Sequence, residues 1–280
     1  MTNKKNVSIF KILVLIVCII LAILSLLPYI IMIVNSTRST YQIQQHAVSF
    51  IPSKYFLNNI KILVGKAFNP LTGFTNSFLL STGITVVTLY FSTLTAYALV
   101  MYEWKLKNAF FSFIMAIMMI PATITIIGFY QMAYKIGMTN KLMILILPAI
   151  ASPSMVFFMR QYMKPSVSPS LVESARIDGS KEFFTFNVIV LPIMKPALAT
   201  QAIFTFVTSW NELFRPLILL TKKAKYTLPI MVSLLRGDIY KREHGAIYVG
   251  LTLTALPLIV VYFILSKYIV AGVAMGSVKG

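Results

Sequence analysis

Residues 165–200 read PSVSPSLVESARIDGSKEFFTFNVIVLPIMKPALAT, a polar stretch between two long apolar runs. Ser168 is a suitable N-cap, and Pro169 fits the first helical position, where its missing amide hydrogen costs nothing. Gly179 accepts the left-handed conformation that commonly ends helices. The stretch therefore predicts a short helix, a turn at Asp178-Gly179 and a second short helix, all on one face of a membrane.

Composition places the flanking sequence in a bilayer. Hydrophobic residues form 58% of the 280-residue chain and charged residues only 11%, whereas soluble domains carry roughly a quarter charged residues. A helix needs about 20 apolar residues to cross the hydrocarbon core. We predict an all-α polytopic membrane protein with six transmembrane helices, at residues 11–34, 76–101, 109–131, 142–163, 196–220 and 246–270.

These spans divide the chain into three parts. Residues 1–10 form a short basic N-terminal segment. Residues 11–270 form the transmembrane domain, with its core at about 72–270 and the polar loop at 165–191. Residues 271–280 form a C-terminal tail. The first apolar run is too long for a signal-peptide core and lacks a small-residue cleavage site, so we expect a retained anchor.

The net charge of +18 comes from loops that flank the spans. Attraction to anionic lipid head groups explains it, and no basic cluster interleaved with aromatic residues indicates nucleic acid. Cys18 is the only cysteine, so the chain forms no internal disulfide. His46 and His244 have no ligand spacing to a second metal-binding residue, so no metal site is expected. The 25 Lys and Arg residues divide almost equally between the two sides, so charge bias leaves the orientation open.

Two helical stripes of polar side chains are candidates for a solute path. Those in the second span are Ser81, Thr85, Thr88 and Ser92, followed by Thr95. Those in the fifth span are Gln201, Thr205, Thr208 and Glu212, with Asn211 beside them. Hydroxyl groups also serve helix packing, and this reading stays open for the second span. The fifth span favours a path because an ionisable group within a span is costly unless used, although Glu212 could instead pair with Arg215. Trp210 could be an interfacial anchor or a sugar platform.

Known catalytic patterns are missing from the sequence. It contains no G-x-x-x-x-G-K-[ST] phosphate loop, no H-E-x-x-H motif and no plausible Ser/His/Asp set. We therefore expect no enzyme activity and no bound cofactor in this chain. Uphill transport would need ATP and magnesium in a separate ATPase subunit.

The polar loop also carries a spaced signature. Glu173-Ser174-Ala175 precedes Gly179 by three residues, and nine more residues lead to Ile189-Val190-Leu191-Pro192. This order resembles the EAA loop of the membrane subunits of bacterial ABC importers, from which Ser174 departs because alanine is usual there. From about residue 50 to 280 the chain resembles the carbohydrate, maltose-type branch. The stretch Ser209-Trp210-Asn211-Glu212 and the ending Gly276-Ser277-Val278-Lys279-Gly280 support that resemblance.

The resemblance implies a type I ABC importer permease fold in the bacterial inner or cytoplasmic membrane, with both termini cytoplasmic. It implies three kinds of partner: a second homologous permease forming a heterodimer, two copies of a cytosolic ABC ATPase, and an extracellular solute-binding protein. The residues it assigns to ATPase coupling are Glu173, Ser174, Ala175, Asp178, Gly179, Leu191 and Pro192. It also brings Val278, Lys279 and Gly280 to the ATPase and the outer loop near 227–235 to the binding protein.

The predicted function is that of the permease subunit of an ATP-driven importer for a sugar, with an oligosaccharide favoured. A polyol or a glycerol-phosphate ester stays open as cargo of the same permease class. An ion-coupled secondary transporter is a different class, and it would need several acids within the membrane, where only Glu212 is found.

Overall fold

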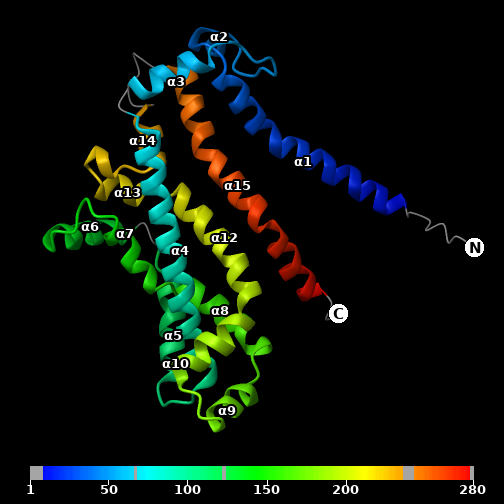
Figure 1. The fold of residues 1–280 in the computed structure, drawn as a ribbon, viewed down its shortest axis with the longest axis vertical. Helices are drawn as coiled ribbons and strands as arrows, with labels where there is room; N and C mark the ends of the chain where they lie inside the picture. The colour runs from blue at the N-terminus through cyan, green and yellow to red at the C-terminus, as the bar shows by residue number, and fades with distance from the viewer. Residues whose placement is uncertain (1–8, 66–67, 122–123, 236–242, 278–280) are drawn as a thin grey trace, which may run out of the picture. The chain divides into compact units, whose positions relative to one another are not determined.

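The computed structural model describes residues 9–65, 68–121, 124–235 and 243–277, and every regular element within these ranges is a helix (Figure 1). The all-α prediction is therefore confirmed. The chain forms two compact units. The first is drawn from residues 1–69 and 232–255, and the second from residues 70–231 and 256–280.

The first unit contains one long apolar helix and several short ones. Its elements are α1 (Ile9–Ser36), α2 (Thr40–Gln45), α3 (Phe56–Gly65), the end of α14 (Leu228–Leu235) and the start of α15 (His244–Ser277). Helix α1 is 28 residues long with a mean hydropathy of 3.2, and no residue in its most apolar stretch is buried. A helix of this length and exposure suits direct contact with lipid.

Buried polar groups hold the turn that follows α1. Arg38 is only 7% exposed, and its guanidinium donates to Asn35 Oδ1 (2.9 Å) and to two main-chain carbonyls, those of Gln42 (3.0 Å) and His46 (2.7 Å). The Asn59 side-chain amide donates to the carbonyls of Ser36 and Arg38, both at 2.9 Å. Because a buried polar group is costly without partners, this network fixes the turn.

Changing Gly245 to alanine is expected to destabilise the chain by about 1–3 kcal/mol, the usual cost of overpacking. A Cβ at this position in α15 would lie 2.5 Å from both side-chain polar atoms of Asn59 and 2.6 Å from the Arg38 carbonyl oxygen. Thermal unfolding of the purified protein in detergent measures the effect. Gly250→Ala is the matched control, because its nearest neighbour would be Val232 Cγ2 at an ordinary 3.4 Å. Equal melting temperatures for the two variants would contradict the expectation.

The second unit is organised around α4 (Pro70–Met101), which packs against α8 and α12. Its other helices are α5 (Lys107–Met118), α6 (Ile126–Lys135), α7 (Met143–Ile146), η1 (Leu147–Ile150), α8 (Pro153–Ser166), α9 (Pro169–Ile177), α10 (Glu182–Phe184), the π-helix η2 (Thr185–Val190), α11 (Leu191–Ile193), α12 (Lys195–Asn211), α13 (Phe214–Leu219) and η3 (Lys223–Lys225). Figure 1 shows α9 and α10 near the C-terminal turns of α4.

The apolar spans are less regular than the sequence predicts. Three described helices are long and apolar enough to cross a membrane, and the number reaches five if each bent pair is one span. Residues 143–150 and 153–166 meet at 41°, and residues 182–193 and 195–211 meet at 79°. The predicted span 109–131 is not one continuous helix, because α5 ends at Met118 and α6 begins at Ile126. Pro121 lies in this interval and cannot continue the hydrogen-bond ladder.

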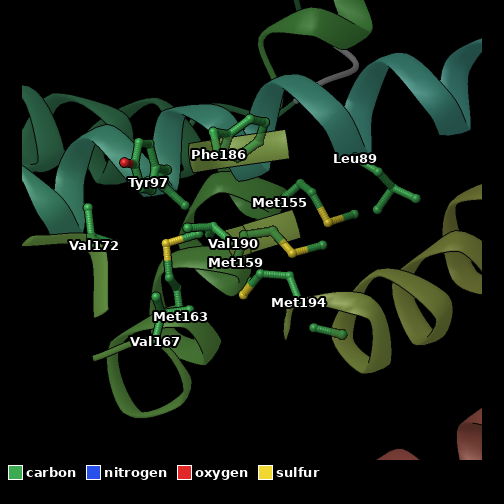
Figure 2. Close-up of a cluster of buried hydrophobic side chains, with 12 residues drawn as sticks. Leu89, Tyr97, Met155, Met159, Met163, Val167, Val172, Phe186, Val190 and Met194 are labelled. Atoms are coloured by element: carbon green, nitrogen blue, oxygen red, sulfur yellow. The ribbon is translucent and has the colours of Figure 1, made fainter. Parts of the chain in front are cut away.

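A core rich in methionine joins α4, α8, α9, η2 and the start of α12 in the second unit, and Figure 2 shows it in close-up. This methionine core comprises Leu89, Ala96, Tyr97, Met155, Met159, Met163, Val167, Val172, Phe186, Val190, Met194 and Ala197. Three of its methionines recur every four residues along α8 and so form one stripe. Because thioether side chains are flexible, they fill the irregular space between α4, α8, α9 and the start of α12.

Candidate functional site

The predicted loop helix is present as α9, and its C-terminal end is sharply defined. Gly179 has a φ of +81°, in the left-handed region that favours glycine. The Gly179 amide donates to the Arg176 carbonyl (3.0 Å), and the Ser180 amide donates to the Ala175 carbonyl (2.9 Å). These two bonds form a Schellman motif, which satisfies carbonyls left free by the last turn.

The two faces of α9 lie in different environments. Val172 and Ala175 are buried, and Val172 belongs to the methionine core (Figure 2). The opposite face exposes Leu171, Glu173, Ser174, Ile177 and Asp178. Ile177 is 86% exposed, which is unusual for a large apolar side chain unless a partner covers it.

Glu182 links α9 to α4 through both of its carboxylate oxygens. Oε1 accepts a hydrogen bond from Arg176 Nε (2.6 Å) and Oε2 accepts one from the Tyr97 hydroxyl (2.9 Å). The Arg176 guanidinium also stands 5.0 Å from the ring centroid of Tyr102, the first residue after α4. The hydrogen bond to Glu182 raises the pKa of Arg176, and burial raises the pKa of Tyr102. Arg176 therefore carries its charge, and Tyr102 is a neutral phenol, at neutral pH.

The sequence analysis did not single out Glu182 or Arg176. The available signal was their opposite charge on either side of Gly179, but no spacing rule fixes a partner across a turn. The remaining predicted loop residues lie further along. Leu191 is half-buried beside the methionine core and Pro192 is exposed, both in α11 just before the 79° bend. Val278, Lys279 and Gly280 lie outside the described residues.

A cavity of about 720 Å³ lies in the second unit. Of the predicted path residues, those that line it are Thr88, Gln201, Thr205, Thr208 and Glu212. Lining residues that the sequence analysis did not name include Thr125, Phe129, Ser152, Ser154 and Phe204. They come from the disrupted middles of the third and fourth predicted spans and from α12, so only the folded chain brings them together.

The other predicted path residues do not line this cavity. Ser81, Thr85 and Ser92 are buried on α4, where Thr85 donates to the Ser81 carbonyl (2.7 Å). The main-chain bond of Thr85 is the kind that the packing interpretation expects. The buried hydroxyl groups of Ser81 and Ser92 have no hydrogen-bond partner among the described residues, so the choice between packing and path stays a prediction for these two. Asn211 is exposed and its side chain donates to the Val207 carbonyl (3.0 Å).

Glu212 caps a helix and forms no ion pair with Arg215. Its Oε1 accepts from the main-chain amides of Phe214 (3.1 Å) and Arg215 (3.3 Å) at the start of α13. The ion pairs among the described residues are Lys107–Glu103 and Arg176–Glu182. Trp210 is 1% exposed and packs against Phe74 and Phe206, each with ring centroids 5.7 Å away, so it is neither an interfacial anchor nor a sugar platform.

The cavity wall combines hydroxyl groups, one side-chain amide and the charged side chains of Glu212 and Arg215 with aromatic rings. This mixture suits a ligand that offers both hydrogen-bonding groups and apolar faces. The described residues hold no group of three or more His, Cys, Asp or Glu side chains that could bind a metal ion.

The coupling-type loop and most of the residues that line the cavity lie in a segment that matches a known family. The family model described as "Binding-protein-dependent transport system inner membrane component" matches residues 88–275. The chain belongs to this family. It is thus a membrane component of a transport system, as the EAA-type signature predicts.

Two named relatives are also transport-system permease proteins, which supports the assignment of this permease to the family. The arabinooligosaccharides transport system permease protein AraQ of Halalkalibacterium halodurans is 34% identical over 251 residues, covering 89% of each chain. The lactose transport system permease protein LacG of Rhizobium radiobacter is 31% identical over 248 residues, again covering 89% of each chain.

A solved structure shares the fold of this permease. It is a chain from the crystal structure of a bacterial ABC transporter involved in the import of the acidic polysaccharide alginate. The TM-score is 0.80 at 23% sequence identity, over 96% of this chain and 99% of that chain. The ABC importer permease fold is therefore confirmed.

Proposed function

We propose that this chain is the permease subunit of an ATP-driven ABC importer for a sugar, with an oligosaccharide favoured. The observation behind this proposal is that two helices, α8 and α12, contribute residues both to the cavity wall and to the methionine core on which α9 packs. Met155 of α8 lines the cavity and belongs to the methionine core. Helix α12 contributes Ala197 to the core and Thr205 to the cavity wall. A displacement of α9 therefore reaches the cavity through packed helices.

The exposed face of α9 is the proposed ATPase docking surface. Its carboxylates and large apolar groups suit a partner cleft with basic and apolar walls. We place this face in the cytoplasm, with both termini on the same side. Closure of an ATPase dimer would then move α8 and α12 and alternate access to the cavity. ATP and magnesium would be held by the two ATPase copies.

Sugar cargo is favoured by the chemistry of the cavity wall and by the relatives. Hydroxyl groups and the Gln201 amide offer donors and acceptors to a polyhydroxylated solute, and Phe129 and Phe204 offer apolar faces. The relatives named above are transport proteins for arabinooligosaccharides and lactose. A second permease would complete the heterodimer, and a solute-binding protein would deliver the cargo near 227–235. Just before this segment, the Asn76 side chain of α4 donates to the carbonyls of Ala224 and Tyr226, both at 3.0 Å, and so ties the loop to α4.

Uptake into proteoliposomes tests the function. The chain is reconstituted with its partner permease, ATPase and binding protein, and labelled arabino-oligosaccharides, lactose and glycerol 3-phosphate are offered in turn. We expect sugar uptake that needs ATP and survives an ionophore. Thr205→Leu, which fills the cavity and removes a hydroxyl, should lower uptake by about fivefold to tenfold, the value of roughly one hydrogen bond.

The matched control is Thr200→Leu, since Thr200 is on the same helix but outside the cavity and bonds the Pro196 carbonyl (3.0 Å). It should transport normally. Uptake of glycerol 3-phosphate alone would move the cargo to the ester class. Uptake that stops with an ionophore and continues without ATP would contradict the ATP-driven importer.

A further inference from the structure

We propose that Glu182 is a positioning residue for coupling, which holds α9 at a fixed angle to the end of α4 so that both move together. This inference rests on the proposed function, because it assigns a role in transmitting ATPase movement. The Glu182 bridge consists of Tyr97, Arg176 and Glu182. It is made by one carboxylate whose two oxygens bind groups from different helices.

The geometry of the bridge is that of strong, directional bonds. The Arg176 contact of 2.6 Å and the Tyr97 contact of 2.9 Å both end on a charged acceptor. Hydrogen bonds to charged groups are shorter and stronger than neutral ones. The Arg176 side chain is 33% exposed and that of Glu182 is 44% exposed, so solvent weakens the ion pair as such. Its value therefore lies in orientation more than in global stability.

The packing of α9 on the methionine core does not fix the orientation of the helix by itself. Val172 is 1% exposed and anchors the helix in the methionine core. Hydrophobic attraction is non-directional, and flexible methionines adapt to a shifted neighbour. Packing on the methionine core therefore resists separation of α9 but permits the helix to rotate and slide. A bond from α9 to Glu182 and a second from Glu182 to α4 remove this freedom, because hydrogen bonds weaken steeply with misalignment.

The chemistry of the bridge requires a carboxylate. Arg176 and Tyr97 both act as donors, so the linking group must offer two acceptor oxygens. Glutamine has one acceptor oxygen, and its amide can donate to the Tyr97 hydroxyl, so Glu182→Gln replaces two bonds to a charged acceptor with weaker bonds to a neutral amide. Tyr97→Phe removes the bond between Oε2 and α4 and keeps the ring in the core, where Tyr97 is 3% exposed.

Thiol labelling of the assembled transporter measures the transmission directly. In a Cys18→Ser background, Ser154→Cys places a reporter on the cavity wall. The rate of maleimide labelling is compared with and without ATP plus vanadate, in the complex with the partner permease and ATPase. We expect ATP plus vanadate to change the rate in the parent. In Glu182→Gln and Tyr97→Phe this change should shrink by about threefold to tenfold, as the weakening or loss of a hydrogen bond to a charged acceptor predicts, while ATPase recovery and hydrolysis persist.

Glu103→Gln is the matched control, because Glu103 forms an exposed ion pair with Lys107 (2.7 Å) and no described bond to α9. It should keep the full ATP-dependent change. Glu182→Gln and Tyr97→Phe behaving like this control would overturn the positioning role. A parent that binds no ATPase or shows no ATP-dependent change would overturn the proposed function first. If Glu182→Gln fails to assemble with the partner permease and the ATPase, the labelling of Tyr97→Phe tests the positioning role by itself.

Discussion

Replacing Gly179 by valine is expected to reduce recovery of the ATPase with the tagged chain by about tenfold, as a loss of roughly 1–2 kcal/mol implies. A Cβ at Gly179 would meet no atom within 4 Å, so the cost comes from the backbone φ of +81° and not from a clash. Relief of that strain would break the Schellman bonds at the end of α9. The docking face would then lose its orientation.

Two controls separate orientation from general damage. Gly179→Asn should bind nearly as well as the parent, because asparagine tolerates the left-handed region. Gly137→Val imposes similar strain at a φ of +66°, also with no atom within 4 Å, but lies after α6 and away from α9. It should lower thermal stability and leave ATPase recovery intact. Equal loss of recovery in both valine variants would show that the effect is not specific to α9.

Replacing Val172 by aspartate is expected to abolish ATPase recovery and lower the melting temperature. The side chain is 1% exposed within the methionine core, where an unpaired carboxylate costs several kcal/mol. Val172→Ala keeps the site apolar and leaves a small cavity, so it should cost about 1–2 kcal/mol and retain partial recovery. Thermal unfolding and co-purification with the ATPase measure both quantities.

Leu171→Asp is the matched control for Val172→Asp, because it introduces the same carboxylate one position earlier. Leu171 is next in sequence but 41% exposed, so its carboxylate stays in water. It should leave the melting temperature unchanged, whatever it does to the docking face. If Val172→Asp melts at the same temperature as Leu171→Asp, α9 is not attached through the methionine core.

The parts of this permease that could be predicted from sequence are those set by local chemistry. The Pro169 start and the Gly179 stop define α9, because both depend on adjacent residues. Ser168 stands at the N-cap position, but its hydroxyl makes no capping bond and instead lies 2.7 Å from the Ser170 hydroxyl. Apolar length similarly predicted α1, α4 and α15. The break between α5 and α6 was signalled by Pro121, although a proline within a span is equally compatible with a kink.

The parts that could not be predicted depend on neighbours distant in sequence. Helical periodicity placed Ser81, Thr85, Thr88 and Ser92 on one stripe, but only Thr88 reaches the cavity. Which part of a stripe meets a cavity depends on the helices packed against it. Glu182 was missed for the same reason, since its partners Arg176 and Tyr97 lie 6 and 85 positions away.

The continuity of α8 sets the distance over which a movement of α9 must be transmitted to reach the cavity. Met155 borders the solute compartment, and Met163, eight positions later, sits among the residues that receive α9. At about 1.5 Å per residue, these two points are roughly 12 Å apart on one uninterrupted rod. Because no loop lies in between, a displacement of the end that contacts α9 would reach the end that lines the cavity with little loss of amplitude.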